Sequence, residues 1–309
     1  MTELDATKID QLASYLKNAK NPVFFGGAGV STESGIPDFR STDGIYNQEY
    51  DYPPETILSH TFFMNKPSEF WRFYRSKMLI FNAKPNPAHS FLANRGIPVI
   101  TQNIDGLHTF AGSEKVYELH GSVLRNYCMK CGTFYGAEAV LGFDEPPRDS
   151  SCLIDYDATK LTDKQLRSIP LCNASVASGG TCGGLIKPDV VLYEEPLDPA
   201  VWDAAEQLVI NADLLIVAGT SMKVYPAASL VSMFTNMYGL KGSVGGGFFG
   251  GKIGGGGAET GKVGSFDSDG NPLKALVVIN RDPVSADNSA QLVIHSNVGE
   301  VFTSVQNNL

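Results

Sequence analysis

The sequence predicts an α/β protein built around buried parallel strands. Residues 23–25, 99–101, 214–217 and 276–279 are short apolar runs rich in β-branched and aromatic residues, which is typical of strands covered on both faces. Apolar residues at helical spacing between positions 5 and 20 predict an amphipathic helix before the first strand. A chain of 309 residues fits one large domain with a smaller insert, or two domains.

The composition favours an intracellular globular protein. Hydrophobic residues make up 43% of the chain and charged residues 18%, enough to bury a core. The net charge of −9 argues against nucleic acid as the main partner. The first residues lack a secretory signal, and no apolar run approaches the ~18 residues of a membrane span. Five cysteines, two of them in Cys-x-x-Cys spacing, favour a reducing compartment and a metal. The predicted location is the cytoplasm.

Glycines follow the first strand directly. Gly27 and Gly29 allow a tight turn in which backbone N–H groups approach a diphosphate. A Gly-x-Gly pair alone could equally be a plain turn. Phe39 and Arg40 close the same stretch, and an aromatic ring can cover a flat ligand while a guanidinium fork suits phosphate oxygens. The stretch therefore predicts a dinucleotide-binding loop.

The second strand ends in polar residues. Gln102, Asn103 and Asp105 follow residues 99–101, at the strand end where open α/β sheets hold ligands. A lone Asn or Asp there is usually a turn former, but three polar residues together indicate a binding site. The stretch 47–84 has no strand signal, and its aromatic residues at helical spacing predict an inserted helical module in which they form core and cleft wall.

Four cysteines have the chemistry of a metal site. Cys128 and Cys131 are spaced to hold one tetrahedral ion, and Cys172 and Cys182 would complete a Cys₄ set. The second pair is unusually far apart, so free cysteines without a metal are the alternative. With no open coordination position, a bound Zn²⁺ would be structural.

Three motifs resemble the sirtuins, a family of NAD-dependent protein deacylases. They are GAGVSTESGIPDFR at 27–40, TQNIDGLH at 101–108 and ELHG at 118–121. The resemblance implies a Rossmann-like, doubly wound parallel sheet with a smaller zinc-binding and helical lobe. Residues 1–46, 85–124 and 185–309 would form the NAD-binding domain, 47–84 the helical module and 125–184 the zinc-binding module. The sequence around Cys172 and Cys182 also resembles the edges of the sirtuin zinc module.

The resemblance also implies the site residues. His120 would be the general base, since an imidazole with a pKa near ~6.5 can take a proton from a ribose hydroxyl, and Asn103 and Asp105 would line the nicotinamide pocket. The acyl-lysine peptide would lie between the strips at 187–194 and 219–226. Further NAD contacts are implied for Gly27, Ala28, Gly29, Thr32, Asp38, Phe39, Arg40, Gln102, Ile104, Gly219, Thr220, Ser221, Asn280 and Val298, and substrate contacts for Val191, Leu192, Tyr193, Glu194 and Val224.

The implied reaction is removal of an acetyl group from a protein lysine, with nicotinamide and O-acetyl-ADP-ribose as products. Family members that prefer succinyl groups carry Tyr-x-x-Arg in the helical module, whereas this chain has Tyr74 and Lys77; a lysine lacks the bidentate fork, so acetyl is the predicted group. The alternatives are a desuccinylase or other deacylase, a protein mono-ADP-ribosyltransferase, and a non-enzymatic NAD-sensing module.

One segment departs from the family pattern. Residues 239–270 contain fourteen of the 32 glycines, a composition that cannot bury enough apolar surface to offset its ordering entropy. The sequence therefore predicts a flexible insertion over 239–272, away from the site motifs.

Overall fold

The computed structural model describes residues 4–39, 50–143, 156–177, 179–236 and 274–309. Its larger part is a parallel six-stranded sheet in the order β3-β2-β1-β7-β8-β9. This is the 3-2-1-4-5-6 order of doubly wound dinucleotide-binding sheets. The strands are β1 (Pro22–Gly26), β2 (Val99–Thr101), β3 (Val116–Glu118), β7 (Leu214–Ala218), β8 (Ala275–Ile279) and β9 (Leu292–Ile294). The four predicted strands are confirmed as β1, β2, β7 and β8.

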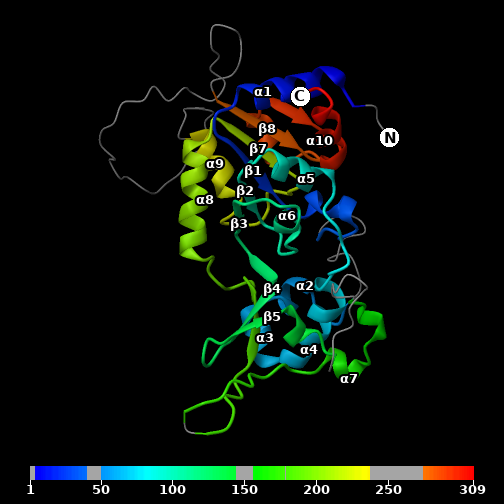
Figure 1. Cartoon of the computed structure of the whole chain (residues 1–309), viewed down its shortest axis with the longest axis vertical. Helices are drawn as coiled ribbons and strands as arrows, with labels where there is room; N and C mark the ends of the chain where they lie inside the picture. The colour runs from blue at the N-terminus through cyan, green and yellow to red at the C-terminus, as the bar shows by residue number, and fades with distance from the viewer. Residues whose placement is uncertain (1–3, 40–49, 144–155, 178, 237–273) are drawn as a thin grey trace, which may run out of the picture.

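Helices cover both faces of this sheet (Figure 1). Alternate strand residues point to opposite faces, so Phe24 packs in one core cluster and Val23 and Phe25 in the other. The Phe24 cluster includes residues of α1 (Ala6–Asn18), α5 (Pro87–Asn94) and α10 (Val298–Gln306), and the other those of α8 (Pro199–Asn211) and α9 (Ser229–Asn236). The predicted N-terminal helix is α1, and the Asp5 side chain caps it by accepting from Thr7 N.

The smaller lobe combines helices with a second sheet. Residues 54–78 form α2 (Pro54–Ile57), α3 (His60–Asn65), α4 (Pro67–Phe73) and the π-helix η4 (Tyr74–Met78), while α7 (Asp163–Leu166) comes later in the chain. The antiparallel sheet has the order β5-β4-β6, from β5 (Phe134–Gly136), β4 (Gly121–Cys128) and β6 (Ile186–Val190). In Figure 1, β4 leads from the six-stranded sheet into this lobe.

A buried cation joins the two parts of the smaller lobe. The Arg75 side chain is 1% exposed, and its guanidinium donates to the carbonyl oxygens of Val140, Gln165, Leu166 and Ser168 at 2.6–3.0 Å. It also lies 5.0 Å from the centre of the Trp71 ring. The aromatic residues predicted to form core do so here, since Phe63, Phe70, Trp71 and Tyr74 are all fully buried.

Two sequence-based predictions lie outside the described residues: the insertion at 239–272 and the NAD contact of Arg40. Across the described part of the chain, no helix combines the length and the apolar character needed to cross a membrane.

Candidate active site

The loop after β1 touches the loop after β7 through glycine backbone. Gly29 N donates to Gly219 O at 2.8 Å, and a Cβ on Gly29 would lie 2.8 Å from Gly219 Cα. Gly219 also has a φ of +58°, a left-handed conformation that favours glycine. The neighbouring 3₁₀ turns η1 (Ala28–Val30) and η2 (Thr32–Ser34) complete the loop. Because β1 and β7 are the central strands, this contact marks the switch point of the sheet, where dinucleotides bind.

Polar residues from the first two strand ends form one buried network. Ser31 Oγ donates to Asp105 Oδ2 at 2.7 Å, and Asn103 Nδ2 donates to Ser31 Oγ at 3.0 Å. Burial raises the pKa of Asp105, while hydrogen bonds from Leu107 N and the Ser31 hydroxyl lower it. An amide and a carboxyl group held this way can read a carboxamide through directed hydrogen bonds.

His120 lies beside this network in a defined tautomer. Its Nδ1 is 3.0 Å from the carbonyl oxygen of Gln102, and a carbonyl can only accept, so Nδ1 carries the proton and Nε2 the lone pair. Burial lowers the pKa of His120, although the Gln102 hydrogen bond raises it. The ring is therefore neutral at neutral pH, as a general base must be.

Two cavities of about 260 and 270 Å³ adjoin around His120. Both are lined by Ala28, Phe39, Gln102, Asn103, His120 and Val224. The first extends past Ile104 and Asp105 to the predicted substrate residues Val191, Leu192, Tyr193 and Glu194. The second extends along Gly29, Asp38, Gly219, Thr220, Ser221 and Asn280. Their shared wall makes one long crevice, whose lining suits a phosphate-bearing nucleotide at one end and an apolar chain at the other.

Three predicted NAD contacts do not line these cavities. Gly27 packs behind the loop, where a Cβ would lie 2.8 Å from Thr220 Cβ. The Thr32 hydroxyl donates to Gly29 O at 3.0 Å and so shapes the loop. Val298 is 2% exposed in the core cluster of α10.

The predicted substrate strip is anchored on both sides. Val191 N donates to His120 O at 3.0 Å, Tyr193 N to Leu58 O at 2.9 Å, and His60 N to Tyr193 O at 3.0 Å. Tyr193 thus pairs with the start of α3, and Val191 with the segment that carries His120. Val224 lines the same cavity from the loop after β7.

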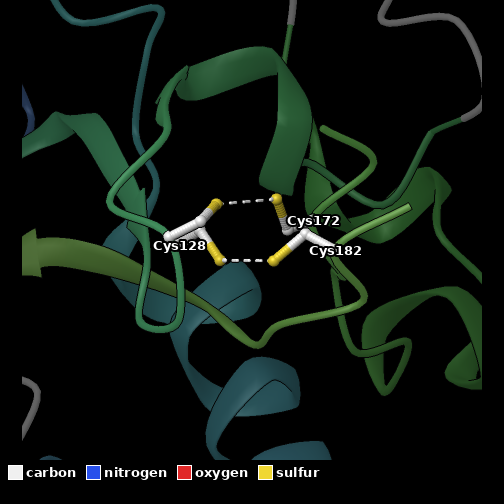
Figure 2. Close-up of side chains that lie close together, drawn as sticks. Cys128, Cys172 and Cys182 are labelled. Carbon is white, nitrogen blue, oxygen red and sulfur yellow. Dashed lines mark hydrogen bonds between the residues drawn. The ribbon is translucent and has the colours of Figure 1, made fainter. Parts of the chain in front are cut away.

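The four predicted cysteine ligands converge in the smaller lobe (Figure 2). Their sulfur atoms all lie within 4.8 Å of one another, with 3.7 Å between Cys128 and Cys182 and 3.5 Å between Cys131 and Cys172. Four Zn–S bonds of ~2.3 Å in a tetrahedron place sulfurs ~3.8 Å apart. The set therefore fits a tetrahedral zinc ion with no coordination position left for substrate.

Several cavity residues were missed by sequence reasoning. Ser31 lies inside the recognised loop motif but has no partner nearby in the sequence, because Asn103 and Asp105 are more than 70 positions away. Met78 reaches the first cavity from the π-helix, beside Lys77, which the sequence already placed near the acyl group. Arg281 lines the second cavity and forms a 3.2 Å ion pair with Asp38.

Comparisons with known proteins agree with this geometry. Residues 27–226 match the Sir2 family. The chain is 40% identical over 305 residues to the NAD-dependent protein deacetylase of Clostridium perfringens (strain 13 / Type A), covering 96% of this chain and 98% of the relative. The Clostridium acetobutylicum protein of the same name matches with the same identity and coverage.

Solved structures resemble the fold over nearly its whole length. A Sir2 complex with p53 peptide and NAD⁺ has a TM-score of 0.68 at 30% identity, covering 96% of both chains. A Sir2 complex with an inhibitor, 2′-O-acetyl-ADP-ribose and deacetylated p53 peptide has a TM-score of 0.67 at 30% identity, covering 96% of this chain and 97% of that one.

Proposed function

The chain belongs to the Sir2 family, and on that basis we propose that it removes acetyl groups from protein lysines with NAD as co-substrate. The observation that carries the proposal is the position of His120, a neutral base on the wall shared by the two cavities. The nucleotide half of the crevice and the peptide half meet at this ring. The products are free lysine, nicotinamide and O-acetyl-ADP-ribose.

NAD, when bound, supplies a ribose carbon that an acyl oxygen can attack and a nicotinamide that can leave. The residues that would hold its diphosphate are the backbone of Ala28 and Gly29 with Thr220 and Ser221 opposite. Asn103, which is buried, and Asp105, which is half-buried, would hold the carboxamide. Asn280 would hold the ribose of the adenosine end.

The protein's own chemistry is to position groups, move a proton and exclude water. His120 Nε2 would take the proton of a ribose hydroxyl, and the Gln102 carbonyl would stabilise the positive ring that results. Val191, Leu192 and Val224 would enclose the acyl-lysine side chain, which keeps its carbonyl oxygen against the reacting carbon and away from bulk water.

We propose acetyl as the preferred acyl group. The part of the first cavity that the second does not share is lined by Ile36, Leu58, Met78 and Ile80, an apolar surface that suits a neutral acyl group. Lys77 is the cation at this wall, and it lacks the fork that would hold a carboxylate bidentately. Tyr74 is fully buried in the core of the lobe and does not line the cavity. Rates on matched acetyl- and succinyl-lysine peptides test this, and a faster succinyl rate would refute it.

Deacetylation is favoured over transfer of ADP-ribose to protein. The reason is that the segment at 191–194, which would bind a substrate peptide, is hydrogen-bonded in place beside His120. The deciding experiment incubates the purified chain with NAD and acetyl-lysine peptides and measures nicotinamide, free lysine and protein-bound ADP-ribose. We expect the first two in equal amounts. ADP-ribose on protein without deacetylation would favour the transferase instead.

The remaining assignments are also proposals. We propose that residues 1–46, 85–124 and 185–309 act as the NAD-binding domain, with 47–84 and 125–184 as the helical and zinc-binding modules. A cytoplasmic location is supported by the four cysteines, which form a metal set and no disulfide among themselves. The acidic net charge supports protein or peptide partners rather than nucleic acid.

A further inference from the structure

An ion-pair cluster bridges the two sheets beside the general base. Arg125 Nε donates to Asp189 Oδ2 at 2.7 Å, and Arg125 Nη1 donates to Glu118 Oε2 at 2.8 Å. Glu118 ends β3 of the six-stranded sheet, whereas Arg125 and Asp189 lie on β4 and β6 of the smaller lobe. One guanidinium therefore connects the two parts of the molecule.

Each of the two carboxylates lies close in sequence to a residue that lines the crevice. Glu118 is two positions before His120, and Asp189 is two positions before Val191. Val191 N donates to His120 O at 3.0 Å, so the two segments already meet at one hydrogen bond. Arg125 connects the same segments a second time. One hydrogen bond allows the His120 and Val191 segments to rotate relative to each other. The second connection, through Arg125, restricts that rotation.

The backbone ladder is weak at this place. The register of β4 and β6 shifts between Gly121 and Asn126, and Pro188, which faces Asn126, has no N–H to donate. Regular pairing between β4 and β6 is therefore interrupted over this stretch, with paired residues at Gly121 and again from Asn126. The Arg125 fork spans this irregular part of the sheet.

The charge of Arg125 stabilises the carboxylates of both Glu118 and Asp189. The Glu118 side chain is 13% exposed, and those of Arg125 and Asp189 are 38% and 37% exposed. Burial raises the pKa of Glu118, and the hydrogen bond and charge of Arg125 lower it again. Among the described residues that line the two cavities, Glu118, Arg125 and Asp189 do not occur. Any effect of these three residues on the reaction is therefore indirect, and His120 and Val191 are the cavity residues two positions from Glu118 and Asp189.

We propose that Arg125 is a positioning residue for deacetylation, which orients the His120 segment through Glu118 and the acyl-lysine strip through Asp189. The inference rests on the proposed function and adds residues to it. A bidentate guanidinium fork is suited to this task because its two donors point in fixed directions. Misplacement of reacting groups by about 1 Å can cost up to about a hundredfold in rate.

The test compares Arg125→Gln with a matched variant, Arg167→Gln. Arg167 also pairs with two carboxylates, Glu69 and Asp163, but it lies on the smaller lobe outside the crevice. We expect Arg125→Gln to lower kcat/KM for an acetyl-lysine peptide about tenfold or more. Its melting temperature should fall by a few degrees at most, because Arg125 and Asp189 are partly exposed and only Glu118, at 13% exposed, loses a partner in a mostly buried place. Arg167→Gln should leave kcat/KM within about twofold of wild type.

The two carboxylates provide an asymmetry that a merely structural role would not produce. Glu118→Gln should lower mainly kcat, because Glu118 lies two positions before His120 and holds that segment to Arg125. Asp189→Asn should act mainly on KM and on the dissociation constant of the acetyl-lysine peptide, measured by fluorescence anisotropy without NAD. If Arg125→Gln does not fold, these two variants decide.

Three results would overturn the inference. The first is a kcat/KM of Arg125→Gln equal to that of wild type, and the second is an equally lowered kcat/KM in Arg167→Gln. The third is that Glu118→Gln and Asp189→Asn change kcat and KM equally and lose stability in parallel. Failure of the proposed function would look different, since the wild type itself would then not deacetylate. The peptide dissociation constants would still report whether the cluster orients the strip.

Discussion

The ring of His120 is held 3.0 Å from the carbonyl oxygen of Gln102, a residue of the same strand end that supplies Asn103 and Asp105. The tautomer of the proposed base is therefore set by the backbone of the proposed nicotinamide site. Any shift of that strand end moves both the base and the pocket beside it.

Substituting His120→Ala should remove the base and keep the crevice. We expect deacetylation to fall about 10²- to 10⁴-fold, the range that general base catalysis contributes. The acetyl-lysine peptide should still bind within about threefold of wild type, since Val191 contacts the backbone of residue 120. Steady-state kinetics and fluorescence anisotropy measure the two effects. A variant with near-normal turnover would exclude His120 as the base.

The same ring determines the pH dependence of wild type. Burial lowers the pKa of His120, and the base form is the deprotonated one, so kcat should rise with pH and level off. The midpoint should lie below the ordinary histidine value of ~6.5. A kcat profile between pH 5 and 8 tests the sign. A rate that falls as pH rises through this range would contradict it.

Gly121 should not tolerate alanine. It has a φ of +75°, and a Cβ would lie 1.9 Å from Asp189 O, so β4 and β6 would have to separate beside His120. Gly132 offers the matched control, because it has a φ of +71° and a Cβ added there would have no neighbour within 4 Å. Both variants carry the left-handed cost of about 1 kcal/mol. Only Gly121→Ala should also lose most of its deacetylation, and equal activities would contradict the steric argument.

Two neighbouring histidines should make the fold acid-sensitive. The rings of His89 and His108 are 4.6 Å apart, and burial lowers the pKa of His89 to about 4 and of His108 to about 3. The unfolded value is ~6.5, so the unfolded state binds more protons in acid. Their contribution is fully present above about pH 6.5 and is lost as pH falls toward 4, by about 2 kcal/mol per ring at pH 5.

Denaturant unfolding of His108→Leu tests this at pH 7 and pH 5. The variant should lose less stability on acidification than wild type, whereas His295→Leu, at an exposed ring, should behave like wild type. An unchanged pH dependence in His108→Leu would show that other groups carry the effect.

Removing one cysteine ligand should release the metal. Cys172→Ser should lower the zinc content to near zero and destabilise the protein by at least about 3 kcal/mol. Cys152→Ser is the control, because the four convergent thiols already complete a tetrahedral set without a fifth cysteine. Metal analysis of the purified variants, with calorimetry, gives both values. Full zinc content in Cys172→Ser would contradict the four-ligand assignment.

Site residues could be predicted from the sequence where neighbouring residues in one short motif form the site together. The strand at 23–25 with its glycines and the polar strand end at 102–105 could be recognised from local pattern, whereas Cys172 and Cys182 were assigned to the metal set with the help of the family resemblance. Ser31 and Arg125 could not, because their partners lie up to 74 positions away in the chain. The contribution of Met78 was also hidden, since a π-helical turn changes which residues share a face.

Arg75 connects the zinc-binding module of the smaller lobe to its helices through the main-chain oxygens of residues 140, 165, 166 and 168. Two residues further on, the chain forms the wall of the acyl pocket at Lys77 and Met78. Removal of the metal from the four cysteines by a chelator should therefore make the cavity wall at Lys77 and Met78 less rigid. Loss of the metal should therefore change the selectivity for acyl groups while the hydrogen bond between His120 and Gln102 stays in place.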